Sequence, residues 1–343
     1  MPVLNLILAD LYAASDLSAT SGWPRLPALE YWLARGDAQA ISNGWRDWLG
    51  VELAGTAMAG CAPAIVAAAA ANVAANGSAT ETMPATGPSG SLWLATPVHY
   101  LVGLDSLRLH PGGLLTLASN EQMLLAADFA RAFAGSGWQL LSTGRRELLL
   151  AGPVMAVPQT VDPARLLGAD PANAQPRGEG AATLRRLAAE IEMWLHEHAV
   201  NRAREQRGTA VVNGLWLWGG GLQSAATFAA TVTRGEQQLY GEDLYTQGLA
   251  RHCGRQARAL PAGAAAILDA GADVSVVLTV GGADAGASLG ELEQQWLAPA
   301  LAATRRARGR QARLLLADRC WTIGPSSHWR WWRRAGPWWE SLR

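Results

Sequence analysis

The fold class rests first on the stretch Val3-Leu4-Asn5-Leu6-Ile7-Leu8-Ala9-Asp10, an almost continuous apolar run that ends on a carboxylate. No basic region precedes this run, so it predicts a buried first β-strand and not a signal peptide. Open α/β sheets bind their ligands at the carboxyl ends of such strands. Asp10 is therefore a candidate ligand-binding residue and a candidate metal ligand, with a turn or helix-capping aspartate as the structural alternative.

Strand and helix patterns alternate along the rest of the chain. Strands are predicted at residues 92–96, where Pro97 ends the run, in a hairpin over 138–150, and at 213–218, 238–240, 274–280 and 313–317. Helices are predicted as two short segments within 25–50 and at 56–75, 120–133, 182–207 and 289–308. This alternation favours an α/β fold with a mainly parallel central sheet flanked by helices. We expect one large domain over residues 1–343, with a flexible insertion at 76–91 and an arginine- and tryptophan-rich tail at 328–343.

The charged residues are balanced and include no lysine. The sequence holds 28 arginines and 28 acidic residues, so its formal net charge is +0. Without lysine, the chain cannot form a Schiff base, hold pyridoxal phosphate as an aldimine or build a Walker A phosphate loop. The neutral balance gives no global attraction to nucleic acid or anionic lipid. The three cysteines are widely spaced and form no CxxC pair. This pattern favours a protein of the reducing cytoplasm over one with a disulfide framework.

A glycine-rich segment is the second candidate site. Residues 213–221 read NGLWLWGGG, and we expect Gly219, Gly220 and Gly221 to form a turn before a helix that begins near Gln223. Glycine amides at a helix start bind phosphate or another anion. The structural alternative, equally weighted, is a tight turn that lets the two neighbouring tryptophans pack.

The third candidate site combines His99, Asp105, Arg108 and His110. Histidine, aspartate and arginine near loops are residue types that serve phosphate sites. The alternative is that these side chains satisfy turns and buried hydrogen bonds. Further along the chain, Glu192 and His196 are four residues apart on one predicted helix face and could ligate one ion, but no HExxH pattern is present. His196 and His198 are two residues apart and point away from each other on a helix, so a solvated or helix-end pair is favoured.

The tail mixes indole and guanidinium groups, reading HWRWWRR at 328–334 and WW at 338–339. Stacking and cation–π contacts could hold single-stranded nucleic acid or a membrane interface. We favour packing of these tryptophans over the last strand of the protein itself. Nucleic acid is accordingly not expected as a partner, and no membrane span is expected.

Several segments taken together resemble the RpfE-type regulatory proteins of bacteria. They are residues 95–99 (ATPVH), 103–105 (GLD), 109–111 (LHP), 133–138 (FAGSGW), 190–198 (EIEMWLHEH), Asn201 with Arg204, and 215–221 (LWLWGGG). The resemblance spans about residues 3–340 and is weakest over 50–90. That family is distantly similar to cofactor-independent phosphoglycerate mutases, in the alkaline phosphatase-like superfamily.

The resemblance implies a central sheet flanked by helices and a metal-binding aspartate after the first strand, the place that Asp10 occupies. It would also imply a serine nucleophile and an Asp-His metal pair, but the sequence contains no Asp-His dipeptide. Trp218 stands where the archaeal-type mutases carry an arginine before the glycines.

Two hypotheses about function follow. The first is a regulatory protein on a degenerate phosphoglycerate mutase-like scaffold, which binds a small anionic metabolite or a protein partner and needs no cofactor. The second is an active metal-dependent phosphomutase or phosphatase, with manganese or zinc as its cofactor. A two-metal site for phosphoryl transfer requires several carboxylates and imidazoles that converge on both ions.

Overall fold

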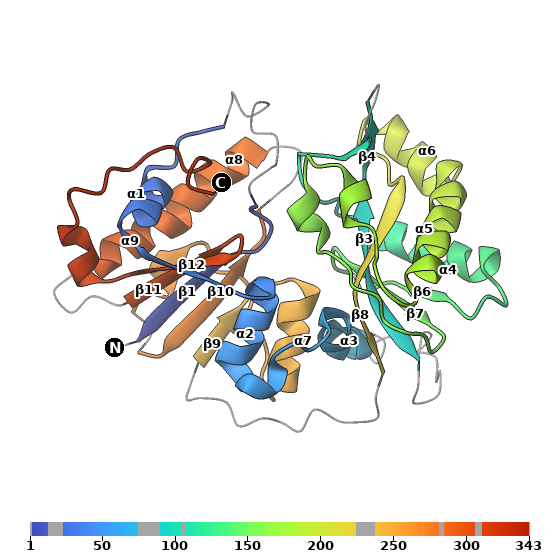
Figure 1. Cartoon of the computed structure of the whole chain (residues 1–343), viewed down its shortest axis with the longest axis horizontal. Coiled ribbons are helices and arrows are strands. Elements are labelled where there is room, and N and C mark those ends of the chain that lie inside the picture. Colours follow the sequence, from blue (N-terminus) through green and yellow to red (C-terminus); the bar gives the residue numbers. More distant parts are fainter. Residues whose placement is uncertain are drawn as a thin grey trace. The chain divides into compact units, whose positions relative to one another are not determined.

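The computed structural model describes residues 2–12, 23–74, 90–103, 107–223, 237–269, 271–280, 285–305 and 311–342. The chain divides into two compact units (Figure 1). The first comprises Met1–Gly60, Thr231–Glu242 and Cys253–Arg343, and the second comprises Cys61–Ala230 and Asp243–His252. The single domain expected over residues 1–343 stays a prediction. Residues 76–89 of the expected insertion lie outside the described residues, and so does nearly all of the helix expected from Gln223.

The first unit is built on a six-stranded mixed sheet in the order β2-β12-β11-β1-β10-β9. Its strands are β1 (Val3–Leu8), β2 (Asp37–Ala40), β9 (Gln237–Tyr240), β10 (Asp273–Leu278), β11 (Gln311–Leu316) and β12 (Arg319–Ile323). Strands β11, β1, β10 and β9 run parallel, whereas β12 is antiparallel to both of its neighbours. The prediction of a mainly parallel sheet is thus confirmed around β1 and wrong at the edge formed by β12 and β2.

Three helices of the first unit pack on this sheet through a shared apolar core: α1 (Pro27–Arg35), α8 (Ala285–Leu292) and α9 (Ala298–Thr304), with a π-helical turn at Glu293–Leu297 between the last two. The unit also contains α2 (Gly44–Ala54). Short 3₁₀ turns occupy Thr56–Met58, Ala264–Ala266 and Pro325–Trp329. The two short helices expected within 25–50 and the helix expected at 289–308 are confirmed, with shifted ends. The Glu293 carboxylate accepts the backbone N–H groups of Ala28 and Leu29, so it satisfies two free donors in the first turn of α1.

The second unit is built on an antiparallel sheet, which the alternation of strands and helices did not predict. Its order is β6-β7-β3-β8, and the strands are β3 (Ser91–Val98), β6 (Gln139–Leu141), β7 (Leu148–Gly152) and β8 (Gly214–Leu222). The expected β6–β7 hairpin is confirmed. Pro97 does not end β3, which continues to Val98. The neighbouring strand β7 pairs with β3 only as far as Ala95, so the proline, which has no N–H, leaves no hydrogen bond to β7 unmade.

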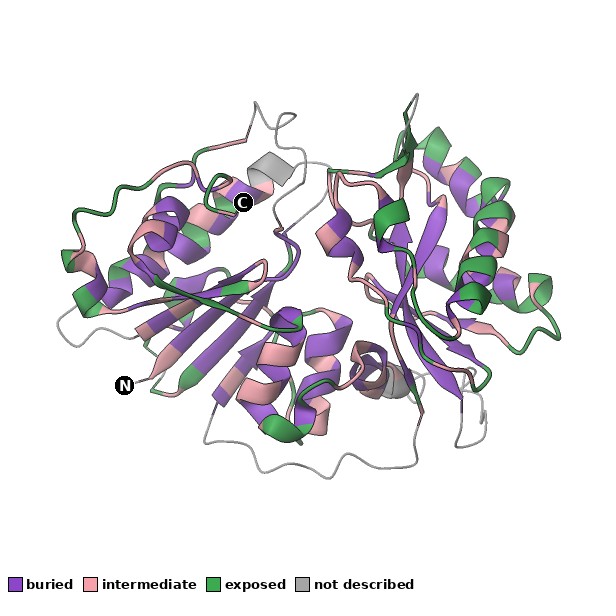
Figure 2. Cartoon of the chain, viewed as in Figure 1, coloured by how far each residue is buried: buried purple, intermediate pink, exposed green. Residues whose placement is uncertain are grey.

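Helices cover both faces of this second sheet. They are α3 (Pro63–Ala74), α4 (Ser119–Ala132), α5 (Ala181–His196), α6 (Ala199–Gln206) and α7 (Leu244–His252), with 3₁₀ turns at Pro163–Leu166 and Pro171–Ala174. Alternate side chains of β3 feed two cores: Leu92 and Leu94 pack with α3, whereas Trp93 packs with α4 and α5. Figure 2 shows β3 buried along its length, as a strand between two helical layers requires.

One long helix predicted at 182–207 is two helices in the structure, because His198 begins a new one. Its Nδ1 accepts the backbone N–H of Val200 at 3.2 Å, which caps α6. Its Nε2 lies 3.2 Å from the Asp128 carboxylate on α4. The helix-end interpretation of His198 is therefore confirmed, and its imidazole joins α6 to α4.

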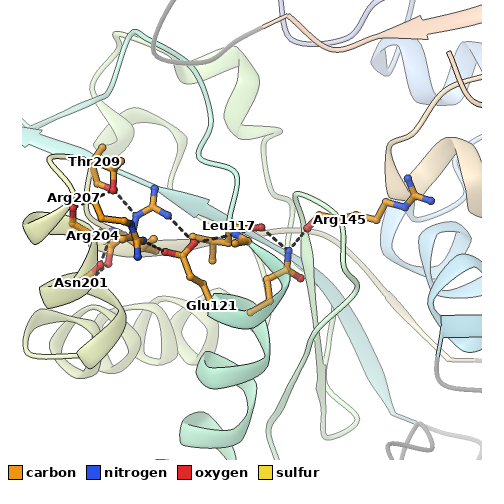
Figure 3. A network of polar contacts seen from close by, with 11 residues as sticks. Leu117, Glu121, Arg145, Asn201, Arg204, Arg207 and Thr209 are labelled. Atoms are coloured by element: carbon orange, nitrogen blue, oxygen red, sulfur yellow. Dashed lines mark hydrogen bonds and ion pairs between the residues drawn. The ribbon is translucent and has the colours of Figure 1, made fainter. Parts of the chain in front are cut away.

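A buried polar network also joins α4 to α6 (Figure 3). The Glu121 carboxylate accepts from the Arg204 guanidinium at 2.9 Å, from Arg207 at 2.5 Å and from the backbone N–H of Ala118 at 2.9 Å. Both the Glu121 and Arg204 side chains are 9% exposed. Arg204 belongs to the segments resembling the regulatory family, and so does Asn201, whose side chain donates to the Leu195 carbonyl at 2.8 Å and to the Val212 carbonyl at 2.7 Å; both thus hold α6 in place.

Burial lowers the pKa of several imidazoles, as it does for His110, His198, His252 and His328, because it disfavours the charged form. The histidines of the unfolded chain have pKa values of about 6.5. The unfolded chain therefore binds more protons than the folded chain at pH values between the lowered pKa values and about 6.5. The stability gained is present above pH 6.5 and is lost as the pH falls through the folded-state pKa values. We expect the free energy of unfolding to decrease from pH 7.5 to 5.5, by up to about 1.4 kcal/mol per pH unit for each extra proton.

Urea unfolding at several pH values measures this slope. The variant His198→Asn keeps a side chain that can cap α6 and removes one imidazole, so its slope is expected to be shallower. A flat or reversed slope in the unmodified protein contradicts the prediction.

Among the described residues, no helix is long and apolar enough to cross a membrane.

Candidate anion-binding site

Asp10 lies where the sequence predicted it, directly beyond the carboxyl end of β1. Leu8 pairs with Leu278 of β10 and with Leu316 of β11, and the backbone N–H of Ala9 donates to the Leu278 carbonyl at 2.9 Å. The Asp10 side chain is buried at this edge of the parallel strands. In the part of the chain that the structure describes, no three histidine, cysteine, aspartate or glutamate residues gather as metal ligands.

The predicted glycine turn is wrong, because Gly219, Gly220 and Gly221 continue strand β8. Between Leu92 and Leu94 the β3–β8 register shifts, so the glycines form a β-bulge, and Gly219 takes the left-handed φ of 62° that such a bulge favours. The Gly219 amide donates to the Thr160 hydroxyl at 3.0 Å.

Close packing explains the other two glycines. A Cβ on Gly220 would lie 2.2 Å from the Trp93 ring, and one on Gly221 would lie 2.6 Å from Ala62. The segment therefore leaves room for Trp93 and helix α3 within a strand, whereas the packing alternative expected a tight turn beside Trp216 and Trp218. The anion-binding role of these glycines stays a prediction.

His99 and His110 are brought together by a β-hairpin. The hairpin pairs β4 (Tyr100–Val102) with β5 (Leu107–Leu109), and His99 precedes β4 while His110 follows β5. The backbone N–H of His110 donates to the His99 carbonyl at 2.9 Å, which extends the ladder by one pair. The two ring centroids lie 5.7 Å apart. Asp105, the fourth residue of this candidate site, lies outside the described residues.

Backbone groups fix opposite tautomers on the two rings. The His99 Nδ1 lies 2.8 Å from the Val211 carbonyl, so it carries the proton and donates, leaving Nε2 as an acceptor. The His110 Nδ1 accepts the backbone N–H of Gly112 at 3.0 Å, so its proton resides on Nε2, which is a donor. Burial lowers the pKa of His110, and His99 lowers it further, so this ring is neutral near pH 7. Two rings whose centroids lie 5.7 Å apart thus offer one donor and one acceptor at their Nε2 atoms.

Arg108 lies on the same side of the hairpin as the two histidines. It pairs with Leu101 across the ladder, two positions from the His99–His110 pair. Residues two apart on a strand project to one face. We call His99, Arg108 and His110 the histidine–arginine face. A guanidinium binds carboxylate or phosphate in a bidentate manner, so this face combines the donors that an anion requires.

Asn213 and Gly214, for which the sequence predicted no role in this site, hold the hairpin in place. The Asn213 side chain accepts the backbone N–H of Tyr100 at 2.7 Å and donates to its carbonyl at 2.9 Å. The Tyr100 ring covers Gly214, where a Cβ would lie 2.5 Å from the ring. Burial, with a smaller effect of Glu192, raises the pKa of the Tyr100 phenol. An Asn-Gly pair at the start of a predicted strand was the available signal.

The structure separates the histidine–arginine face from the glycines. Val98, next to His99, pairs with Gly214, whereas Gly221 pairs with Leu92 at the other end of β3. The six steps along β3 from Leu92 to Val98 span roughly 20 Å of strand. Asp10 belongs to the other compact unit. His99 and His110 are therefore the predicted site residues whose side chains the structure shows close together, with Arg108 two ladder positions away.

Searches of family models and of curated proteins found no match to the sequence. Among solved structures, the chain is similar to a cofactor-independent phosphoglycerate mutase from Thermoplasma acidophilum DSM 1728, with 12% identity, a TM-score of 0.40, and coverage of 94% of this chain and 90% of that one. It is also similar to the PH0037 protein from Pyrococcus horikoshii, with 12% identity, a TM-score of 0.40, and coverage of 94% and 87%. Similarity at this level does not assign the chain to a family.

Proposed function

We propose that this chain is a regulatory protein of the RpfE type, located in the cytoplasm, that binds a small anionic metabolite at the histidine–arginine face. The observation that carries the proposal is the pair of opposite tautomers at His99 and His110, fixed by Val211 and Gly112. Such a pair is preorganised to recognise a group that both accepts and donates a hydrogen bond. A regulatory protein needs recognition of this kind and no reacting group.

The chemistry of the face favours a phosphate monoester or a hydroxy acid. An unprotonated phosphate oxygen accepts from the His110 Nε2–H and from the Arg108 guanidinium. A protonated phosphate oxygen or a ligand hydroxyl donates to the His99 Nε2. The ligand therefore carries one negative group and one O–H donor within the reach of two rings whose centroids lie 5.7 Å apart.

Calorimetric titration with inorganic phosphate and 3-phosphoglycerate tests the proposal. We expect His110→Ala and Arg108→Ala each to weaken binding by about 10- to 100-fold, since a hydrogen bond to a charged group contributes roughly 1.5–3 kcal/mol. His196→Ala is the matched control, because that histidine is exposed at the end of α5. Equal affinities in all four proteins, or no binding of either anion, contradict the proposed site.

Metal-dependent phosphotransfer is the second candidate, and the buried carboxylate of Asp10 at the end of β1 favours it. A carboxylate there suits manganese or zinc, although further ligands must join it. Two equivalents of bound metal and turnover of 2- or 3-phosphoglycerate, both lost in Asp10→Asn, would replace the regulatory proposal with this one.

A further inference from the structure

Three tryptophans of the tail are exposed to solvent. Trp329, Trp331 and Trp332 are 78%, 77% and 63% exposed, whereas Trp338, in the same tail, is 1% exposed in the core of the first unit. The predicted packing of the tail on its own protein is therefore correct for Trp338 and wrong for the other three. Clustered exposed indoles on a folded protein mark an interaction surface. We call Trp329, Trp331, Trp332, Arg333 and Arg334 the tail surface.

His328 ties the beginning of this surface to the fold. Its Nε2 lies 2.9 Å from the Thr304 hydroxyl, which itself donates to the Leu301 carbonyl at 2.7 Å, so the imidazole is the donor. Its Nδ1 is then the acceptor for the Tyr31 hydroxyl at 3.0 Å. The ring is thus held from both sides by helices α9 and α1.

The middle and the end of the segment are anchored as well. The Arg330 guanidinium forms a bidentate pair with the Asp37 carboxylate, with both distances 2.7 Å. The Trp338 indole N–H donates to the Pro24 carbonyl at 3.1 Å, and its ring lies 4.7 Å from that of Trp23. The three indoles are therefore presented by a segment fixed along its length, and their exposure is a property of the fold.

The surface also carries positive charge. Asp37 is neutralised by Arg330, which lowers the pKa of that carboxyl most, while the nearby Arg333 lowers it further. Arg333 donates to the Gly36 carbonyl at 3.3 Å, and within the described ranges neither Arg333 nor Arg334 forms an ion pair with a carboxylate. Both residues are exposed, and they directly follow Trp332 in the sequence. The local charge is positive, although that of the whole chain is zero.

The geometry of the indoles distinguishes between two anionic partners. Single-stranded nucleic acid binds to rings on which successive bases stack. The Trp331 and Trp332 planes are inclined at 81°, with centroids 6.3 Å apart, so they do not form a parallel platform. Tryptophan at a membrane surface requires no parallel stacking, since each indole places its apolar body among lipids and its N–H near the headgroups.

We propose that the tail surface docks on an anionic lipid bilayer, with the three indoles at headgroup level and Arg333 and Arg334 against lipid phosphates. This docking is independent of anion binding at the histidine–arginine face. Interfacial binding scales with the buried apolar area and with attraction to anionic lipids, so both parts of the surface contribute.

Flotation of the full chain with lipid vesicles tests the proposal. We expect the protein to float with phosphatidylcholine–phosphatidylglycerol vesicles, in a 7:3 ratio (~30% anionic lipid), and much less with phosphatidylcholine alone. Trp331→Ala combined with Trp332→Ala is expected to lower partitioning at least about tenfold. Arg333→Ser combined with Arg334→Ser is expected to lower it by about tenfold or more on anionic vesicles only, since each basic residue near such a surface contributes roughly 1 kcal/mol.

Met193→Ala is the matched control, because Met193 is 71% exposed on α5 and belongs to the second unit, whereas the tail belongs to the first. It is expected to float as the unmodified protein does. Circular dichroism of each variant confirms that it is folded. Failure of the intact protein to float, equal flotation on neutral and anionic vesicles, unchanged flotation of the folded tryptophan variant, or loss of flotation in Met193→Ala would each overturn the proposal. Displacement from the vesicles by a single-stranded oligonucleotide that binds the tail more tightly would also overturn it, in favour of a nucleic-acid surface.

Discussion

Replacing Glu121 by alanine is expected to lower the free energy of unfolding by about 3–5 kcal/mol. The substitution removes the carboxylate that pairs with Arg204 and Arg207, and the Arg204 side chain is only 9% exposed. Its guanidinium keeps one bond, from Nε to the Ala210 carbonyl at 2.7 Å, but loses its counter-charge. A buried charge left without its partner accounts for most of this loss. Urea unfolding followed by circular dichroism gives the difference.

The matched control for this prediction is Glu190→Ala on α5. Glu190 also pairs with an arginine, Arg186, one helical turn away, but the two side chains are 41% and 83% exposed. Exposed pairs with this spacing contribute only about 0.3–0.5 kcal/mol. If the Glu121 and Glu190 variants lose similar amounts of stability, the network joining α4 to α6 does not have the role assigned to it.

Gly220→Ala is the second large effect expected, with a loss of about 1–3 kcal/mol or more. Its Cβ would lie 2.2 Å from the Trp93 ring, a distance that no pair of non-bonded carbon atoms tolerates. Trp93 is fully buried and its indole N–H donates to the Ser91 hydroxyl at 3.3 Å, so the ring has no free space to enter. Either β3 and β8 separate locally or the indole leaves its rotamer.

Gly290→Ala provides the comparison, because nothing lies within 4 Å of a Cβ added there on α8. Alanine in a helix is more favourable than glycine by about 0.5–1 kcal/mol, so this variant is expected to gain stability. Thermal and urea unfolding, together with the near-ultraviolet circular dichroism of the tryptophans, compare the two variants. A Gly220→Ala protein as stable as the unmodified one shows that the close contact with Trp93 does not constrain the strand.

The central part of the first sheet could be predicted because its signal is local. Val3–Leu8 is apolar at nearly every position, as a strand covered on both faces must be, and Asp10 follows it. The edge strand β2 could not be predicted, since Asp37–Ala40 is exposed throughout and shows no alternation. Its place in the sheet comes from pairing with β12, which lies nearly three hundred residues further along the chain (Trp321 pairs with Ala38).

The candidate sites show the same division between local and long-range signals. The pairing of His99 with His110 follows from a short hairpin, so sequence proximity placed them in one site. Their tautomers depend on the Val211 carbonyl and the Gly112 amide, which no local pattern indicates. The turn predicted for the glycines of β8 was wrong because the groups that require them, the Trp93 ring beside Gly220 and Ala62 beside Gly221, lie far away in the sequence.

Asn5 of β1 pairs with Ser275 of β10 and with Arg313 of β11 in the first sheet, so the sequence separation between paired strands approaches the length of the chain. The second unit is assembled almost entirely from one continuous stretch, Cys61–Ala230. Contacts distant in sequence form slowly, and chains fold in the order in which their segments are synthesised. The second unit can therefore complete its sheet during translation, whereas β1, made before every other strand, acquires both of its neighbours only after residue 316 has emerged.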